Sequence, residues 1–391
     1  MISMLPKTLS LYVHIPFCAR KCNYCDFLSF NAEKELMDEY FDALEKEISK
    51  SAKEYKDRTV TTIFFGGGTP SFADEKRVCG LLQRIRDEFN VSADAEISIE
   101  VNPASAMRDK LVSYRAAGFN RLSIGCQSLS DDELKILGRL HSSSMFVETF
   151  NNARNAGFDN INVDVMSALP GQSLDSYGST LKRVLELEPE HISAYSLIIE
   201  EGTPFYDMEL DIPDEDTDRA MYHETKRILK EHGFHRYEIS NYALGAGDDD
   251  AYECRHNKVY WQRGNYLGLG LGAASMVDNV RWSNIRDIGT YVKELADAES
   301  SFDKIRENVE ELSVKAQMEE FMFLGLRLVR GVNVRQFKET FGKDISDVYG
   351  NVIDKYLGMG LLQYAGDEEN YLSLTDEGLD VSNTVMADFL L

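Results

Sequence analysis

The amino-acid sequence predicts an α/β fold, a partial (β/α)6 barrel followed by a mainly helical, winged-helix-like C-terminal domain. Two observations support this prediction. Up to about residue 200, short β-rich runs alternate with longer amphipathic stretches, the pattern of repeated βαβ units and a parallel sheet. Beyond that point the rhythm stops, and from about residue 305 the pattern is mainly helical. The chain has 391 residues, 43% of them hydrophobic, which is enough for a sizeable core and two or three domains.

Six strands are expected in the barrel, each bounded by polar or glycine-rich segments. They cover residues 9–15, 61–67, 96–102, 121–127, 161–169 and 191–199. Between them, the clearest amphipathic helices cover residues 38–55, 74–89 and 174–187. In barrels of this kind the chemistry lies at the C-terminal ends of the strands, so polar and glycine residues are expected to cluster there.

The chain is expected to divide into a barrel core (1–210), a barrel extension (211–304) and a C-terminal domain (305–391). The extension is expected to hold a helix over 221–233, after an acidic surface loop over 207–219, and then an irregular stretch. In the last region a small hairpin and a final helix should follow three helices, at 309–330, 334–341 and 346–359. The glycine-rich segment 266–276 has some likeness to a dinucleotide-binding loop. It does not lie between a clear strand and helix, so a dinucleotide-binding loop is not expected.

The charge balance argues against nucleic acid as a partner. With 66 acidic and 42 basic residues the formal charge is −24, a field that repels phosphate backbones. The first ten residues lack the pattern of a signal peptide. No apolar segment is long enough to span a bilayer, which leaves only peripheral contact with a membrane open. Six cysteines in a long chain do not suggest a disulfide framework, so a cytoplasmic protein is expected. The sequence gives no oligomeric state.

Three of the cysteines, Cys18, Cys22 and Cys25, form a C-x3-C-x2-C cluster just after the first expected strand. Thiolates are soft ligands that select zinc, copper(I) or iron–sulfur clusters. A structural zinc site or an ordinary 4Fe–4S site would need a fourth ligand, and no other cysteine lies nearby. Three cysteines would leave one iron open to a non-protein ligand, which suits catalysis. The alternative is three buried cysteines without a metal, which this close spacing makes improbable.

Polar and glycine residues do gather where the expected strands end. The segment GGGTP ends the second strand, Glu100 and Asn102 end the third, and Gln127 ends the fourth, while Asp164 lies within the fifth. Each of these residues could instead have a purely structural role: the glycines could form a tight turn, and the acidic residues could cap a helix. Their coincidence at equivalent places favours a common site.

The cysteine cluster and its flanking text YVHIPFC resemble the signature of the radical SAM superfamily, and in particular the coproporphyrinogen III oxidase-like family. The resemblance is dense over residues 9–200 and weaker beyond. It implies a radical SAM barrel in which the three cysteines hold a 4Fe–4S cluster and S-adenosylmethionine chelates the open iron. It also implies that backbone at Gly67, Gly68 and Thr69 approaches the methionyl part of that cofactor. The other cofactor contacts that it implies are Tyr12, Tyr24, Glu100, Gln127, Arg139 and Asp164. Without the resemblance, Arg139 would be taken for a solvated charge on a helix face.

The sequence segment ECRHNKVYW holds a second group of candidate residues: Cys254, His256, Asn257, Tyr260 and Trp261. Neutral imidazole is a good axial ligand for haem iron, and aromatic rings can stack on a porphyrin. A histidine beside aromatics is nevertheless more often a core residue. The spacing HNxxYW resembles a motif of the heme-chaperone (HemW-like) branch of the same family, which implies haem contact at His256. Cys254 is a competing ligand, and a Cys-x-His zinc site lacks obvious partners.

Two departures from the oxidases of this family bear on function. Those oxidases carry a further cysteine two residues after the third, where this chain has Phe27. They also have a longer N-terminal segment than this chain shows before its first expected strand. Relatives in the chaperone branch often have histidine where this chain has Ala274, so a contact from that position is not expected. We therefore expect a heme chaperone that binds a 4Fe–4S cluster, S-adenosylmethionine and haem as cargo, and passes haem to acceptor proteins.

The alternative is an oxygen-independent coproporphyrinogen III oxidase of porphyrin biosynthesis, and whether the chain is an enzyme stays open. No catalytic residue is assigned. An RNA-acting radical SAM enzyme is opposed by the charge. A zinc-stapled scaffold predicts bound zinc and no brown colour.

Overall fold

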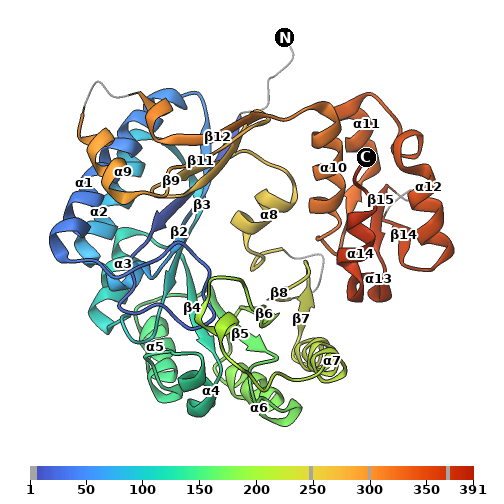
Figure 1. The fold of residues 1–391 in the computed structure, drawn as a ribbon, viewed down its shortest axis with the longest axis horizontal. Helices are drawn as coiled ribbons and strands as arrows, with labels where there is room; N and C mark the ends of the chain where they lie inside the picture. Colours follow the sequence, from blue (N-terminus) through green and yellow to red (C-terminus); the bar gives the residue numbers. More distant parts are fainter. Residues whose placement is uncertain (1–6, 246–249, 298–300, 367–369) are drawn as a thin grey trace.

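The computed structural model describes residues 7–245, 250–297, 301–366 and 370–391. Its centre is a twelve-stranded sheet in the order β12-β11-β10-β9-β1-β2-β3-β4-β5-β6-β8-β7 (Figure 1). The six strands expected from the sequence are all present and adjacent strands among them pair in parallel. They are β1 (Thr8–Ile15), β2 (Thr59–Gly67), β3 (Asn90–Val101), β4 (Arg121–Gln127), β5 (Ile161–Ser167) and β6 (His191–Ser196). The predicted α/β barrel core is confirmed.

Helices between these strands cover the outer face of the sheet (Figure 1). Several begin at a side chain that accepts a hydrogen bond from the first turn, as Asp74, Ser142 and Ser173 do, because such caps satisfy otherwise free N–H groups. The helices are α1 (Lys34–Glu54), α2 (Glu75–Glu88), α3 (Arg108–Ala117), α4 (Asp131–Ile136), α5 (Ser143–Asn155), α6 (Leu174–Leu185) and α7 (Glu215–Glu231), with short 3-10 turns at Pro70–Phe72 and Pro204–Asp207. The acidic segment 207–219, expected to be entirely a loop, enters α7 at Glu215, because acidic side chains favour a helix N-terminus.

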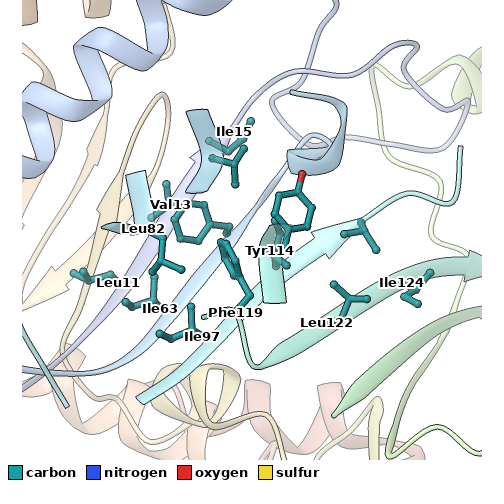
Figure 2. Packing of buried hydrophobic residues seen from close by; sticks show 14 of the residues in the cluster. Leu11, Val13, Ile15, Ile63, Leu82, Ile97, Tyr114, Phe119, Leu122 and Ile124 are labelled. Atoms are coloured by element: carbon teal, nitrogen blue, oxygen red, sulfur yellow. The ribbon is translucent and has the colours of Figure 1, made fainter. Parts of the chain in front are cut away.

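Alternation along the strands separates two environments. Side chains such as Leu11, Val13 and Ile15 of β1 are fully buried and face the helices, where Figure 2 shows them packed with residues of β2–β4 and with Leu82, Tyr114 and Phe119. Each such aliphatic side chain contributes about 1.5–3 kcal/mol by burial. The intervening residues face the concave side of the sheet and include Tyr12, Glu100 and Asp164. The inside of the barrel is therefore polar.

The sheet extends beyond the six parallel strands at both edges. β8 (Asn241–Leu244) and β7 (Phe234–Arg236) follow β6, and β9 (Tyr266–Leu269) pairs in parallel with β1. Three antiparallel strands continue from β9, namely β10 (Ala274–Val277), β11 (Val280–Asn284) and β12 (Arg306–Glu311). Helix α9 (Ile288–Ala296) and a 3-10 turn at Phe302–Lys304 lie between β11 and β12. Among the described residues the two edge strands, β7 and β12, do not pair with each other, so the sheet does not close into a complete barrel.

Two expectations for the chain beyond β8 are wrong. The stretch expected to be irregular contains regular structure: its glycine-rich part, 266–276, is a strand, a turn and a second strand, because its backbone completes the sheet beside β1. No dinucleotide loop was expected there, and the segment forms none. The helix expected over 309–330 is shorter, since β12 takes residues up to Glu311 and α10 runs from Val314 to Gly325. Pairing with β11 overrides the helical preference of the charged run at β12.

The C-terminal region has its own hydrophobic cluster, built around Met322, Phe337 and Phe389. Its elements follow in the order helix, strand, helix, helix, strand, strand, which is the winged-helix-like arrangement expected. They are α10, β13 (Val332–Asn333), α11 (Val334–Phe341), α12 (Ile345–Gly358), β14 (Leu362–Ala365) and β15 (Tyr371–Leu374), followed by α13 (Asp376–Asp380) and α14 (Ser382–Ala387). The turn of the expected hairpin includes 367–369, outside the described residues. The exact domain boundaries stay a prediction.

A short helix, α8 (Arg255–Trp261), lies between the concave face of the sheet and the C-terminal region (Figure 1). Its first turn donates two backbone hydrogen bonds of 2.9 Å to the Glu96 carboxylate on β3. At its other end the Arg327 guanidinium stacks 4.2 Å above the Trp261 ring. Arg263 and Glu320 form a 3.0 Å ion pair just beyond it. The HNxxYW segment therefore joins the barrel to the C-terminal region. No helix in the described parts of the chain combines the length and apolar character that a membrane span requires.

Candidate functional site

A cavity of about 350 Å³ opens at the C-terminal ends of the barrel strands. It is lined by all three clustered cysteines and by nearly every residue that the sequence predicted for the cofactor: Tyr24, Gly67, Gly68, Thr69, Glu100, Gln127, Arg139 and Asp164. Only Tyr12 and His256 of the predicted set lie elsewhere, in an adjoining chamber. Residues that lie more than 140 positions apart in the sequence thus line one cavity, as expected where parallel barrel strands end.

The cysteine loop, residues 18–27, is held by hydrogen bonds at several points. Cys18 donates its N–H to Phe30 O at 3.0 Å, and its sulfur lies 3.3 Å from the Thr69 hydroxyl. Further along the loop, Asn23 N–H bonds Leu137 O at 3.0 Å. These bonds hold the cysteine loop against the glycine turn and the segment that follows α4.

The cysteine arrangement can be tested against the metal it would hold. Among the described residues, no three Cys, His, Asp or Glu side chains converge as the ligands of a single metal ion do. A cubane cluster offers a separate iron to each thiolate, so its cysteines need to share a cavity without converging on one point. Cys18, Cys22 and Cys25 meet that condition, because all three line the same cavity.

The glycines of GGGTP are required by packing as well as by the cavity. Gly67 has φ +110°, and a Cβ there would lie 2.4 Å from the His14 ring. A Cβ at Gly68 would lie 2.9 Å from the carbonyl oxygens of Ile15 and Phe17. The His14 ring donates from Nε2 to Leu28 O at 2.9 Å and accepts at Nδ1 from the Tyr12 hydroxyl at 3.1 Å. The glycine turn, His14 and the cysteine loop therefore pack as one unit.

Arg139 reaches into the cavity from the segment after α4 and is half-buried, so it is not a solvated helix-face charge. Its Nη2 donates to Gly125 O at 2.7 Å, and its Nη1 lies 3.9 Å from Cys22 Sγ. Burial, together with this guanidinium, lowers the pKa of His141 to about 3. Arg139 thus presents a fixed cation beside the cysteine loop, suited to a carboxylate.

The sequence reasoning missed Ser193 and Tyr195, which line the cavity from β6. The Tyr195 hydroxyl donates to Gln127 Oε1 at 3.1 Å. Gln127 itself has φ +66° at a bulge between β4 and β5, a strained conformation of the kind found at functional sites. Alternation in His191-Ile192-Ser193-Ala194-Tyr195 marks the inward residues, a signal that could have found both.

Two carboxyl groups face each other inside the barrel. Burial, and after it the nearby Asp164 carboxylate, raise the pKa of Glu100 from 4.5 to about 8, although the Gly67 N–H, 3.2 Å away, acts in the opposite direction. Burial also raises the pKa of Asp164, which accepts from Asn162 Nδ2 at 2.8 Å. At neutral pH the Glu100 carboxyl is therefore mostly protonated.

This protonation predicts a pH-dependent stability. The pKa of Glu100 is higher in the folded than in the unfolded chain. Its stabilising contribution to the free energy of unfolding is therefore complete below pH 4.5 and is lost as the pH rises through about 8. We expect the free energy of unfolding of the cofactor-free protein to fall between pH 6 and pH 9 by on the order of 2–3 kcal/mol more than that of Glu100→Gln. Urea denaturation at the two pH values measures this. Parallel curves for the two proteins would contradict the assignment.

A chamber of about 190 Å³ adjoins the cavity and shares Glu100 and Asp164 with it. Tyr12 and His256 line it. His256 is 1% exposed, stacks on Phe64 and holds both ring nitrogens in 2.8 Å hydrogen bonds, Nδ1 to the Thr62 hydroxyl and Nε2 to the Tyr260 hydroxyl. Burial lowers its pKa to about 3, so the ring is neutral.

A haem iron bound by His256 would have to displace the hydroxyl of Thr62 or Tyr260 from a ring nitrogen. Haem ligation by His256 stays a prediction. The competing ligand Cys254 is fully buried, with its sulfur 3.8 Å from a Glu96 carboxylate oxygen. Ala274 is exposed on β10, outside both the cavity and the chamber.

Comparison with known proteins places this geometry in a class. The model of the radical SAM superfamily matches residues 12–184, and that of the HemN C-terminal domain matches residues 312–381. The fold and the cysteine-lined cavity are those of a radical SAM protein, a class that implies a 4Fe–4S cluster and S-adenosylmethionine.

Relatives of known name define the branch. Heme chaperone HemW of Bacillus subtilis (strain 168) is 34% identical over 97% of this chain and 99% of its own length. Heme chaperone HemW of Escherichia coli (strain K12) is 39% identical over 69% of this chain and 70% of its own. The solved coproporphyrinogen III oxidase (HemN) of Escherichia coli, a radical SAM enzyme, superposes with a TM-score of 0.82 at 25% identity, covering 99% of this chain and 91% of that one. The chain belongs to the heme chaperone HemW family of the radical SAM superfamily.

Proposed function

We propose that this chain is a heme chaperone, which binds a 4Fe–4S cluster, S-adenosylmethionine and haem, and transfers the haem to acceptor proteins. The observation that carries the proposal is the similarity to curated heme chaperones along nearly the whole of both chains. The six free cysteines are in keeping with a reducing, cytoplasmic setting, which we propose as well.

In this proposal Cys18, Cys22 and Cys25 hold the cluster, which when loaded supplies an open iron and one-electron chemistry. Arg139 pairs with the carboxylate of S-adenosylmethionine, and the glycine turn admits its methionyl part. Asp164 and Glu100 face its positive charges and hydroxyls. Gln127 is held in place for the cofactor by Tyr195.

The second candidate is an oxygen-independent coproporphyrinogen III oxidase, favoured by the fold shared with the solved oxidase of that name. Phe27 speaks against it. It occupies the position of the oxidases' further cysteine, and its side chain is 69% exposed at the rim of the cavity, where it offers no thiol.

An anaerobic turnover assay separates the two functions. Cluster-reconstituted protein is given S-adenosylmethionine, a reductant and coproporphyrinogen III, with a known oxidase alongside. We expect no protoporphyrinogen from protein whose cluster is intact by visible absorption. Conversion at a rate comparable to the oxidase would overturn the chaperone proposal.

A haem titration then tests the cargo. We expect saturable haem binding by the wild type, weakened in His256→Ala if the iron displaces Tyr260 or Thr62 from the ring. Cys254→Ala is the matched variant for the competing thiolate. Failure of the wild type to bind haem would remove the proposal.

A further inference from the structure

The turn of the glycine-rich segment lies against the end of β1 and against the residue that follows the cysteine loop. This support turn, residues 270–272, comes directly after β9. A Cβ at Gly270 would lie 2.7 Å from His14 O, and a Cβ at Gly272 would lie 2.5 Å from the Leu28 side chain. Both glycines are needed because the support turn approaches these two segments too closely for a side chain.

Tyr40 of α1 lies where the support turn meets β1. It is fully buried, and its hydroxyl donates to His14 O at 2.7 Å and accepts the Leu271 N–H at 3.1 Å. Its ring stands edge-on to Phe17, the residue before Cys18, with 5.2 Å between the ring centroids. A single side chain therefore bonds both the support turn and the strand that leads into the cysteine loop.

Glu47, two turns further along α1, holds the other side of the support turn. Its carboxylate accepts the Gly270 N–H at 2.7 Å and the Tyr291 hydroxyl at 2.5 Å. Asn284 Nδ2 bonds the same carboxylate at 2.6 Å and Gly270 O at 2.8 Å. The three side chains are at most 2% exposed. The support turn cannot shift without breaking buried hydrogen bonds, which are costly to lose.

The contacts continue from the support turn to the cysteine loop. His14, whose carbonyl accepts from Tyr40, donates from Nε2 to Leu28 O at 2.9 Å. The Gly67 turn lies over the same imidazole, with its Cβ position 2.4 Å from the ring. The two segments that would hold the cluster and the methionyl part of S-adenosylmethionine therefore rest on one hydrogen-bonded assembly, anchored on α1.

We propose that Tyr40 is a positioning residue for the cluster, and that it fixes the cysteine loop through the support turn and His14. The inference rests on the cluster binding in the proposed function. Tyr40 does not line the cofactor cavity, so it acts on the thiolates only through the backbone that it holds. The glycine-rich segment thereby gains a role at the site although it binds no ligand itself.

The test compares two buried tyrosines that lose only a hydroxyl. Tyr40→Phe removes both hydrogen bonds and keeps the ring. Tyr114→Phe is the matched control, because Tyr114 is fully buried in the same hydrophobic cluster and its hydroxyl has no hydrogen-bond partner. The full-length proteins are reconstituted anaerobically, and the loss of the cluster to an iron chelator is followed by visible absorption. Electron paramagnetic resonance of the dithionite-reduced cluster is recorded with and without S-adenosylmethionine.

We expect Tyr40→Phe to take up a cluster, to lose it to the chelator about tenfold faster than the wild type, and to show a changed resonance spectrum. Tyr114→Phe should stay within about twofold of the wild-type rate and keep its spectrum. Wild-type rate and spectrum in Tyr40→Phe, or equal changes in both variants, would overturn the proposal. A lower free energy of unfolding combined with a wild-type spectrum would mark Tyr40 as merely structural, and would overturn it too.

A second variant keeps the test decisive if Tyr40→Phe does not fold. Tyr291→Phe removes one hydrogen bond to Glu47 and leaves the bonds to β1 in place, so it should speed cluster loss in the same direction by a smaller factor. A wild-type chain that takes up no cluster defeats the proposed function together with this inference. A loaded cluster that responds to neither substitution defeats this inference alone.

Discussion

Replacing Cys22 by serine is expected to abolish the visible absorption of the reconstituted protein. The three cysteines line one cavity without a fourth thiol among its walls, so loss of one leaves two ligands for a cluster that needs at least three. The fold should persist, because the Cys22 residue is only partly buried and its sulfur makes, within the described chain, one side-chain hydrogen-bond contact, with Arg139 at 3.9 Å. Iron content and absorption near 400 nm after anaerobic reconstitution measure the effect.

Cys79→Ser is the matched control. Its thiol lies on α2, away from the cavity, and bonds Ser113 O at 3.7 Å. We expect its iron content to equal that of the wild type. A Cys22 variant that keeps its full absorption would show that the cluster, if present, is held elsewhere.

Replacing Gly67 by alanine is expected to destabilise the protein by about 3 kcal/mol or more, since the backbone conformation and the contact with His14 are both unfavourable for a side chain. The φ of +110° is one that L-residues rarely adopt, and the new Cβ would lie 2.4 Å from the imidazole. Moving His14 would break its bond to Leu28 and loosen the cysteine loop. Both the free energy of unfolding and cluster uptake should therefore fall.

Gly80→Ala provides the comparison, because Gly80 is exposed on α2 with open space around its Cβ position. There the same substitution should stabilise by about 0.5–1 kcal/mol, as alanine is the better helix former. Denaturant unfolding of the two variants side by side measures the contrast. Equal effects would mean that the Gly67 turn tolerates a side chain.

The sequence was most informative where local pattern and topology agree. The alternation of short β-rich runs with amphipathic stretches predicted β1 to β6, and with them the edge where their functional groups meet, because parallel strands bring their C-terminal ends together. Cys18, Glu100 and Arg139 could be assigned to one site from such signals and from the family signature.

Where a residue's role depends on distant partners, the sequence was a poor guide. The strand β9 was missed because it is a short run in a glycine-rich segment, which is not typical of strands, and because its pairing with β1 joins residues more than 250 positions apart. His256 stands in an aromatic motif that suggested a ligand, yet its bond to Thr62 spans 194 residues and could not be seen in the motif itself. Tyr195 could have been found from alternation, but its bond to Gln127 could not.

The pairing of β1 with β9 has a consequence for synthesis on the ribosome. As the chain emerges, β1 can pair with β2 after about 60 residues, but its other edge stays unpaired until Leu269 has left the exit tunnel. An exposed strand edge invites wrong pairing with other chains. The cysteine loop, which follows β1 directly, is therefore held on a half-finished scaffold for most of translation. Iron loading before that point would meet a nascent chain whose first strand still has a free edge.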